Sequence, residues 1–499
     1  MDRPRGGGET PSLLSAHSPQ YRQGPHSVEG PSCGGPMRGS MAPRTPLAVV
    51  ILAAGQGTRM KSDLSKVLHD LGGRPLLHWP LAAAEALRPE ALVVVIGRDA
   101  GRVAAAFEGR ATFVVQAEQK GTGHAVQQAE PALRGHRGDV LVLYGDVPLL
   151  RVETLERLRA TKAETGADLV MLTSPTPLPG LVFRDASGRV QRIVEVTDAS
   201  PEELRIQEGN TGVYLLGAEL LWKALAQLDD QNQQGELYLT DVVERAVAEG
   251  RRVEALRLED ADECLGVNDR RELAYAAAVA RRRTVERLMA QGVTFVDPQS
   301  AWLDADVEIG RDTIVEPSVR ITGATRIGAR CHVKPHCVIE ASEIGDDCEL
   351  GPSAHLRPGT RLHDHVRIGN FVEVKNSELG SGVKADHLSY VGDADVGPGA
   401  SFGAGSITVN YDWERKHRTK IGARAKTGCN ANLVAPLEIE PGAFVAAGTT
   451  VTKTVPTDAI AVSTGRQRNL DGWAERRRRG KKPGEGPASS EPGEGPASE

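Results

Sequence analysis

Residue types suited to binding phosphate follow the first strongly apolar run of the sequence. Gly55 and Gly57 come directly after residues 47–53, and Arg59 and Lys66 follow them. Glycines let backbone N–H groups approach a phosphate, and the two cations add full positive charges. The spacing matches neither G-x-G-x-x-G nor the Walker pattern, so an ordinary strand-to-helix turn is the alternative. We predict a phosphate site at this turn.

A second loop and a carboxylate extend this pattern. Residues 116–124 precede a helical pattern and offer amide and hydroxyl groups that suit the edge of a nucleobase. Asp146 follows the apolar run 139–144, and a carboxylate there could bridge Mg²⁺ to phosphates. A helix cap or turn former is the other interpretation of a lone Asp.

An α/β fold would bring these residues together. Apolar runs of strand length occur at 47–53, 91–96, 112–115, 139–144 and 168–172, with helical patterns such as 152–164 between them. This alternation predicts βαβ units and a mostly parallel sheet. Ligands of such sheets bind beyond the carboxyl ends of the strands, where the residues above fall. We therefore expect an α/β domain over residues 47–267.

Six motifs in this region resemble the sugar-1-phosphate nucleotidylyltransferases. They are Leu52–Met60, Gly121–His124, Tyr144–Asp146, Asn210–Tyr214, Gly235–Asp241 and Gly266–Asn268. The match is closest to the bifunctional bacterial enzymes that act as N-acetylglucosamine-1-phosphate uridylyltransferase and glucosamine-1-phosphate N-acetyltransferase. That resemblance implies a Rossmann-like domain that transfers uridylyl from UTP, with pyrophosphate release.

The resemblance also assigns roles to individual residues. It implies that Asp146 and Asn268 hold Mg²⁺ and that Arg59 and Lys66 are catalytic residues that meet the phosphates. Nucleotide binding falls on Leu52, Ala53, Ala54, Gly55, Lys66, Gln116, Gly121 and Thr122. Binding of the N-acetylglucosamine phosphate falls on Gly180, Glu195, Asn210 and Asn268.

A linker helix is expected within residues 268–296. Residues 269–291 are rich in Ala, Arg and Leu, contain no Gly or Pro, and end at Gly292. This composition and the glycine stop signal favour a helix. A spacer between domains and a helix packed on the first domain are both compatible with the pattern.

A period of six residues dominates 297–456. The aliphatic anchors are Ile309, Val315, Ile321, Ile327, Val333 and Ile339, then Ile344, Leu350, Leu356, Leu362, Ile368 and Val374, and later Ile421, Leu433, Ile439, Val445 and Val451. Three hexapeptides make one triangular coil whose aliphatic residues stack inside. We predict a left-handed parallel β-helix. Cys331 and Cys337 occupy the same slot of consecutive hexads, which indicates small core residues on different faces rather than a zinc site.

The β-helix region resembles hexapeptide acyltransferases, and specifically the acetyltransferase half of the same bifunctional enzymes. The resemblance rests on Leu356–Gly359, Phe371–Lys375, His387–Tyr390 and Val409–Asp412. It implies acetyl transfer from acetyl-CoA to the amine of glucosamine 1-phosphate with His387 as base, a role that suits an imidazole. Sugar-phosphate binding falls on Arg357, Lys375, Tyr390 and Ser401, with Lys416 as a further phosphate contact. Acetyl-CoA binding falls on Asn410, Tyr411, Cys429 and Ala447, and Asn410 and Tyr411 also orient the sugar.

Several positions depart from the family pattern. They are Ser65 for Pro, Lys120 for Leu, Leu181 in the sugar-pocket stretch, Ser401 for Asn, Trp413 for a small residue, Cys429 for Ser, and Thr464 where some members have Arg. They concern the sugar-pocket wall and the affinities for substrate and cofactor more than the metal centre or His387.

Composition and charge exclude several classes of protein. The net charge of −6 over 499 residues gives no basic field for nucleic acid. Six cysteines without a C-x-x-C pair favour a reducing, cytoplasmic compartment, and no apolar run is long enough to span a membrane. Residues 1–46 and 457–499 are expected to be a disordered extension and a low-complexity tail. The partners we expect are small-molecule substrates and two further copies in a homotrimer.

Three functions compete on this sequence. The first is the two-step synthesis of UDP-N-acetylglucosamine, which would feed peptidoglycan and lipopolysaccharide precursors. The second keeps only uridylyl transfer, with the β-helix as a trimerisation scaffold. The third is a non-catalytic regulatory subunit, since subunits of translation exchange factors join similar domains; the presence of Asp146, Asn268, Arg59 and Lys66 argues against it.

Overall fold

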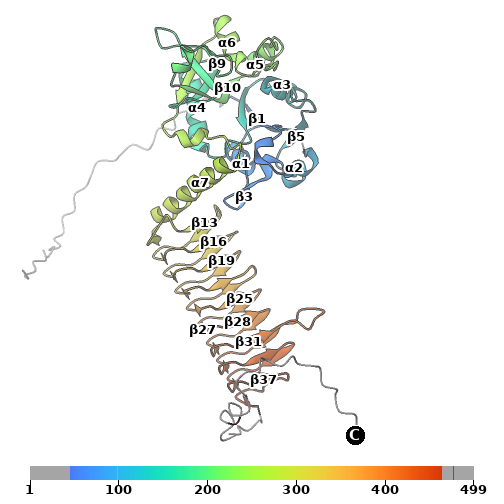
Figure 1. Cartoon of the computed structure of the whole chain (residues 1–499), viewed down its shortest axis with the longest axis vertical. Helices are drawn as coiled ribbons and strands as arrows, with labels where there is room; N and C mark the ends of the chain where they lie inside the picture. Colours follow the sequence, from blue (N-terminus) through green and yellow to red (C-terminus); the bar gives the residue numbers. More distant parts are fainter. Residues whose placement is uncertain (1–44, 98, 464–475, 477–499) are drawn as a thin grey trace, which may run out of the picture. The chain divides into compact units, whose positions relative to one another are not determined.

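The computed structural model describes residues 45–97, 99–463 and 476. Within them an α/β domain is followed in sequence by one long helix and then by a solenoid of short strands (Figure 1). The predicted extension 1–46, except for residues 45 and 46, and the predicted tail from residue 464, except for Arg476, lie outside the described residues. Among the described residues, no helix is both long and apolar enough to cross a membrane.

The α/β domain is built on one mixed sheet with the strand order β11-β7-β10-β6-β1-β4-β5, to which the β8–β9 hairpin is joined through β10. The central strand β1 pairs in parallel with both β4 and β6, whereas β10 runs antiparallel to its neighbours. The strands are β1 (Leu47–Ala53), β4 (Ala91–Ile96), β5 (Thr112–Val115), β6 (Asp139–Tyr144), β7 (Leu169–Ser174), β8 (Gly180–Arg184), β9 (Val190–Glu195), β10 (Gly209–Gly217) and β11 (Val253–Arg257).

Both faces of this sheet are buried, which explains why β1 is apolar without interruption. Val50 and Leu52 belong to one hydrophobic cluster, whereas Val49 and Ile51 belong to the other. Successive side chains of a strand point to opposite faces, so a strand covered on both sides carries apolar residues at every position. The mostly parallel sheet that the sequence predicts is confirmed, with β10 as an antiparallel member.

Helices cover the sheet and connect its strands. They are α1 (His78–Ala86), α2 (Ala100–Ala106), α3 (Thr122–Gln127), α4 (Val152–Thr165), α5 (Ala218–Leu225) and α6 (Asp241–Ala248). Short 3₁₀ turns are η1 (Thr58–Met60), η2 (Lys66–Leu68), η3 (Glu130–Leu133), η4 (Glu203–Arg205) and η5 (Ala261–Cys264). A small hairpin of β2 (Asp70–Leu71) and β3 (Arg74–Pro75) follows η2 directly.

The long helix α7 spans Arg270–Ala290. The Asp269 carboxylate caps it by accepting hydrogen bonds from the backbone N–H groups of Arg271 and Glu272. Ala276, Val279 and Ala280 pack with the α/β domain, whereas Val285 and Leu288 belong to the core of the solenoid. The helix therefore contributes to two hydrophobic cores along its length.

The solenoid consists of three parallel sheets, which we call the first, second and third faces. The first face contains β12 (Thr294–Phe295), β15 (Ile314–Val315), β18 (His332–Val333), β21 (Glu349–Leu350), β24 (Arg367–Asn370), β27 (Lys384–His387), β30 (Ser401–Phe402), β33 (Lys426–Thr427), β36 (Phe444–Val445) and β38 (Ile460–Ala461). The second contains β13 (Trp302–Leu303), β16 (Arg320–Thr322), β19 (Val338–Glu340), β22 (His355–Leu356), β25 (Glu373–Lys375), β28 (Tyr390–Gly392), β31 (Ile407–Val409), β34 (Asn432–Val434) and β37 (Thr450–Val451). The third contains β14 (Glu308–Ile309), β17 (Arg326–Ile327), β20 (Glu343–Ile344), β23 (Arg361–Leu362), β26 (Glu378–Leu379), β29 (Ala394–Val396), β32 (Thr419–Ile421) and β35 (Leu437–Ile439).

The six-residue anchors lie inside this solenoid, as the sequence predicts. Every predicted aliphatic anchor is buried, and Ile321, for example, stacks in register on Ile339 of the next coil. Cys331 and Cys337 precede strands of different faces and are also buried. The left-handed β-helix fold is confirmed, and its strands run from Thr294 to Ala461, slightly beyond the predicted 297–456 at both ends.

Candidate active sites

The first candidate site lies at the edge of the α/β sheet where β1 and β6 end. Because these neighbouring strands are parallel, their carboxyl ends meet at one edge. Leu52, Ala53 and Ala54 are buried there, whereas a Cβ atom added to Gly55 would meet nothing within 4 Å. The backbone N–H of Gly145 donates to Leu52 O at 2.8 Å, which joins the two turns. The glycine turn thus has open space beside it.

Lys66 connects three segments that are distant in the sequence. Its side chain is 9% exposed, and its Nζ atom lies 2.5 Å from Asp146 Oδ2 and 3.2 Å from Asn268 Oδ1. The backbone N–H of Val267 donates to Asp146 O at 2.8 Å, and that of Asn268 donates to Glu272 Oε2 at 2.6 Å. Asp146, Asn268 and Lys66 therefore form one cluster, and Glu272 at the start of α7 orients it.

The donor set of this cluster suits Mg²⁺. A carboxylate oxygen and an amide oxygen converge on one positive group, the Lys66 ammonium, and both are oxygen ligands of the kind that Mg²⁺ prefers. Among the residues that the structure describes, no group of three or more His, Cys, Asp or Glu side chains is placed to hold a metal. Two protein ligands are sufficient for Mg²⁺ when substrate phosphates and water complete its coordination.

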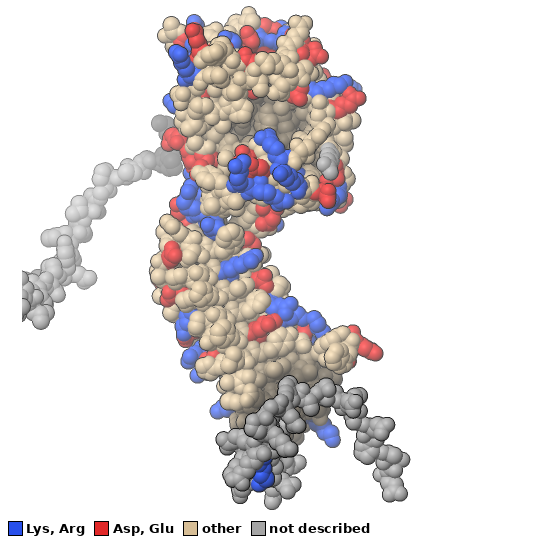
Figure 2. Space-filling model, viewed as in Figure 1, with Lys and Arg blue, Asp and Glu red and all other residues tan. Residues whose placement is uncertain are grey.

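The residues predicted to bind the sugar phosphate lie side by side on three strands. Gly180 pairs with Glu195 on one side and with Asn210 on the other. These three residues line a cavity of about 720 Å³. Arg59, Thr122, Tyr144 and Asn268 also line it. Lys and Arg side chains gather beside a hollow in the α/β domain (Figure 2). Burial raises the pKa of Glu195, and the Thr240 hydroxyl donates to its Oε1 at 3.5 Å.

The predicted nucleobase loop is held by close backbone packing. Gly121 has φ +100°, and a Cβ atom there would lie 2.5 Å from Leu237 O, so only glycine fits. The Thr122 hydroxyl accepts a hydrogen bond from Leu239 N at 3.0 Å. The Gln116 side chain is buried, and its Nε2 lies 3.1 Å from Gly121 O, so this amide N–H supports the loop itself.

Two tyrosines at this site are missing from the sequence assignments. Tyr144 precedes Asp146, and its pKa is raised first by burial and then by the charges of Asp146 and Glu195. Tyr238 lines the same cavity, and its buried hydroxyl has no hydrogen-bond partner among the described residues. Both lie in the motifs named above, and for Tyr144 its place two residues before the proposed metal ligand Asp146 was the available signal.

The departures in this half have local explanations. Ser65 has φ −54°, close to the value that proline would impose, so the backbone before Lys66 keeps its direction. The Lys120 ammonium lies 2.7 Å from Glu118 Oε2 at the surface. Leu181 is buried and pairs with Gly209, so it contributes to the hydrophobic core behind the sugar pocket.

The second candidate site lies on the solenoid, where the second face turns into the third. Lys375 ends β25, and Asn410 follows β31. The Asn410 Nδ2 atom lies 3.3 Å from the Tyr390 hydroxyl, and Arg357 donates to Glu373 Oε1 at 2.8 Å. The charge and contact of neighbouring Lys375 lower the pKa of Lys416. A cationic cluster of Arg357, Lys375 and Lys416 is therefore present, with Tyr390 and Asn410 beside it.

His387 lies at the opposite edge of the second face. It ends β27 on the first face and is exposed, and its carbonyl accepts from Gly405 N at 3.3 Å. The same turn of the next three coils carries Ala404, Cys429 and Ala447 in that order, and Gly448 N donates to Cys429 O at 2.8 Å. One chain thus places His387 in a column with two of the predicted acetyl-CoA residues. No contact in the described residues joins His387 to the cationic cluster.

The loop between β31 and β32 projects from the solenoid. Tyr411 pairs with Lys416 across it, and the Tyr411 hydroxyl donates to Trp413 O at 2.6 Å. Trp413 is 90% exposed at φ +79°. Ser401 lies half-buried on the first face between Lys384 and Lys426, away from the cationic cluster, and Cys429 is an exposed free thiol. Thr464 lies outside the described residues.

A nucleotide-binding sheet edge joined to a hexapeptide solenoid defines a transferase with two candidate sites. The family model "MobA-like NTP transferase domain" matches residues 49–247, and "Bacterial transferase hexapeptide (six repeats)" matches 341–376. The chain is 46% identical over 449 residues to "Bifunctional protein GlmU" of Pelobacter propionicus, covering 86% of this chain and 98% of the relative. It is 47% identical over 448 residues to the protein of that name from Syntrophotalea carbinolica, and these residues cover 86% of this chain and 96% of the relative. To the protein of the same name from Corynebacterium efficiens the chain is 44% identical over 459 residues, which cover 87% of this chain and 94% of the relative.

The chain belongs to the family of the bifunctional protein GlmU. It is therefore an enzyme with a nucleotidyltransferase domain and a hexapeptide-repeat acetyltransferase domain. The sequence-based recognition of the family is confirmed. The individual residue roles remain predictions.

Proposed function

We propose that this chain makes UDP-N-acetylglucosamine in two steps, acetyl transfer to glucosamine 1-phosphate and then uridylyl transfer from UTP. The observation that carries the uridylyl step is the convergence of Lys66, Asp146 and Asn268 at the sheet edge beside the sugar cavity. Phosphoryl chemistry needs positioning and charge neutralisation rather than a protein nucleophile. This cluster offers both.

In uridylyl transfer a phosphate oxygen of N-acetylglucosamine 1-phosphate attacks the α-phosphorus of UTP. The bond from that phosphorus to the oxygen bridging to the β-phosphate breaks, and pyrophosphate leaves. Arg59 and Lys66 balance the phosphate charge, and Gly180, Glu195 and Asn210 hold the sugar. Mg²⁺, held by Asp146 and Asn268, would supply further charge neutralisation at the phosphates. Gln116, Gly121 and Thr122 bind the uracil, and Leu52 to Gly55 form the floor under the nucleotide.

In acetyl transfer the amine nitrogen of glucosamine 1-phosphate attacks the thioester carbonyl of acetyl-CoA. His387 accepts the amine proton, the carbon–sulfur bond breaks, and coenzyme A leaves as the thiol after protonation. Arg357, Lys375 and Lys416 bind the phosphate, with Tyr390 and Ser401 at the sugar. Asn410, Tyr411, Cys429 and Ala447 contact acetyl-CoA.

We infer that three copies of the chain complete the acetyl site. The argument is that His387 and the cationic cluster lie at opposite edges of the second face, so a neighbouring copy can close a crevice against either edge. The chain has a mass of 53.2 kDa, so sedimentation should give about 160 kDa for a homotrimer. A sedimentation mass equal to that of one chain, at the concentration used in the assay, would contradict the proposed trimer. A cytoplasmic location belongs to the same proposal, since the five described cysteines are free thiols.

The two alternatives are less favoured. Both the scaffold and the regulatory-subunit hypotheses would leave one or both clusters without a role. Relatives that match over most of the chain carry the name bifunctional.

The test follows thiol release and pyrophosphate release separately in one protein. Glucosamine 1-phosphate, acetyl-CoA, UTP and Mg²⁺ should yield free coenzyme A, pyrophosphate and UDP-N-acetylglucosamine. His387→Ala should abolish coenzyme A release but keep pyrophosphate release when N-acetylglucosamine 1-phosphate is supplied. Asp146→Asn should have the opposite effect. Thiol release that is unchanged in His387→Ala would favour the scaffold alternative.

A further inference from the structure

A buried carboxylate lies at the centre of the cationic side of the solenoid. Asp393 occupies the turn between β28 and β29, and its side chain is only 6% exposed. Its backbone is in the left-handed region with φ +50°. An ionised group at this depth is costly unless it is paired and hydrogen-bonded. Asp393 was not among the predicted site residues.

Three side chains from neighbouring coils are aimed at this carboxylate. Asn376 Nδ2 donates to Oδ1 at 2.6 Å, and Asn410 Nδ2 donates to Oδ2. The Lys375 ammonium lies 3.5 Å from the same Oδ2. The Asp393 backbone also accepts from Thr419 N at 3.0 Å and donates to Lys375 O at 2.9 Å. One buried group therefore fixes the direction of two proposed site residues, Lys375 and Asn410.

The carboxylate also balances charge. Arg357, Lys375 and Lys416 form the cationic cluster, and Arg357 already has Glu373 as a partner. Asp393 is the carboxylate in contact with Lys375 among the described residues. Without that carboxylate, Lys375 would face the like charge of Lys416 without compensation.

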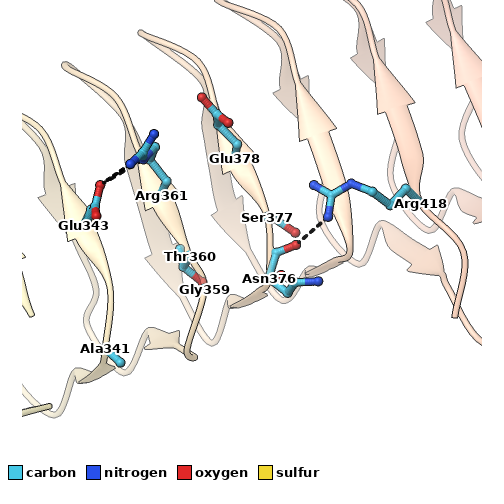
Figure 3. Close-up of a pocket in the computed structure, with 9 residues that line it drawn as sticks. All are labelled: Ala341, Glu343, Gly359, Thr360, Arg361, Asn376, Ser377, Glu378 and Arg418. Carbon is cyan, nitrogen blue, oxygen red and sulfur yellow. Dashed lines mark hydrogen bonds and ion pairs between the residues drawn. The ribbon is translucent and has the colours of Figure 1, made fainter. Parts of the chain in front are cut away.

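On the outer side of the turn, Arg418 holds the same segment. Figure 3 shows its guanidinium directed at the Asn376 backbone, in a pocket that Arg361 and Glu343 also line. Arg418 donates to Asn376 O at 3.2 Å and to Ala394 O at 3.1 Å, and it pairs with exposed Asp395. The two hydrogen bonds to main-chain oxygens support, from outside the solenoid, the coil that carries Asp393.

We propose that Asp393 is a positioning residue for acetyl transfer, whose carboxylate orients the Lys375 ammonium and the Asn410 amide toward the sugar phosphate and the acetyl donor. This inference rests on the proposed acetyltransferase function. Asp393 itself touches no reacting atom, because it lies behind these two side chains.

The titration behaviour of the site agrees with this geometry. Burial opposes ionisation of Asp393, but the hydrogen bonds from Asn376 and Asn410 and the Lys375 charge outweigh it, so its pKa lies below the usual value. The charged groups that interact with it are Lys375, Lys416 and Arg418, and Tyr390 and Arg357 act in turn on Lys375 and Lys416. Replacing the carboxylate by an amide should lower the pKa of Lys375, since its neighbours would then be cations.

The first experiment compares Asp393→Asn with wild type and with Asp395→Asn, a matched change on the exposed side of the same segment. We expect KM for glucosamine 1-phosphate to rise about tenfold or more in Asp393→Asn, with a much smaller change in kcat. Asp395→Asn should stay close to wild type. Pyrophosphate release by the other domain should be unchanged, which shows that the α/β domain is folded, and the retained kcat for acetyl transfer shows that the solenoid is folded.

The second readout is the pH dependence of kcat/KM for glucosamine 1-phosphate. Phosphate binding is lost as Lys375 deprotonates, so the alkaline limb should move about one pH unit lower in Asp393→Asn. A packing defect alone would lower the profile without moving this limb. Kinetics of Asp393→Asn that match Asp395→Asn in both readouts would overturn the proposal.

A second variant tests the positioning role of Asp393 if Asp393→Asn does not fold. Asn376→Gly removes one hydrogen bond to the carboxylate, and Gly tolerates the φ of +45° at this position. It should raise KM in the same direction by a smaller factor, and no change in KM would contradict the proposal. If wild type releases no coenzyme A at all, the proposed function fails instead, so the two failures are distinguishable.

Discussion

The Lys66 ammonium touches both proposed metal ligands. Replacing it in Lys66→Met keeps the bulk of the side chain but removes the charge that balances the phosphates. We expect the rate of pyrophosphate release to fall by about 10²–10³, with coenzyme A release unchanged. Lys120→Leu, which restores the family residue on the exposed side of the nucleobase loop, is the control. A Lys66→Met rate within a few-fold of wild type would contradict the assignment.

We expect the stability of the protein to depend on pH through Asp241, the first residue of α6. Burial and then the charge of Glu244 raise its pKa to about 6. The folded state therefore holds this proton more tightly than the unfolded state, and stability is lost as pH rises from about 4 to 6. Asp241→Asn lacks this loss, so its melting temperature should exceed that of wild type at pH 7.5 and converge with it near pH 4. Thermal unfolding at both pH values tests this, and equal curves at pH 7.5 would contradict it.

The turn before α3 is an element whose geometry depends on one glycine. Gly121→Ala would place a Cβ atom 2.5 Å from Leu237 O, which forces the nucleobase loop away from the segment around Leu237 that supports it. We expect KM for UTP to rise strongly while acetyl transfer is retained. Gly101→Ala in α2 is the matched control, because its added Cβ would meet nothing within 4 Å. An unchanged KM in Gly121→Ala would show that the loop can shift without harm.

Some elements follow from the sequence more directly than others. β1 and the hexapeptide coils are predictable because each repeats one rule, an apolar run buried on both faces or one anchor every six residues. The contact of Lys66 with Asn268 joins residues 202 positions apart, and no periodic pattern encodes such a distance. The role of Asp393 escapes sequence reasoning for a similar reason. Its partners come from the coils before and after its own, and an Asp after a glycine resembles any turn.

At the scale of the whole molecule, α7 links the two cores. Leu288 is completely buried in the solenoid cluster, whereas its neighbour Met289 is 42% exposed. Leu288→Ala should lower the free energy of unfolding of the solenoid by about 2–5 kcal/mol. Met289→Ala should change that free energy by no more than about 0.5 kcal/mol. Denaturant unfolding followed by loss of each activity measures this. Equal midpoints for the two variants would show that the helix end is not part of the solenoid core.

The coils of the solenoid also bear on how such a chain can change over generations. Each coil rests only on the one before and the one after it, so an alteration at one level reaches two neighbours and no further. The projecting loop at residues 409–420 lies in the connection from β31 on the second face to β32 on the third, and each strand still pairs with the coils before and after it. A lineage can therefore change a loop beside one candidate site, such as the loop that carries exposed Trp413, without disturbing the coils on either side of it.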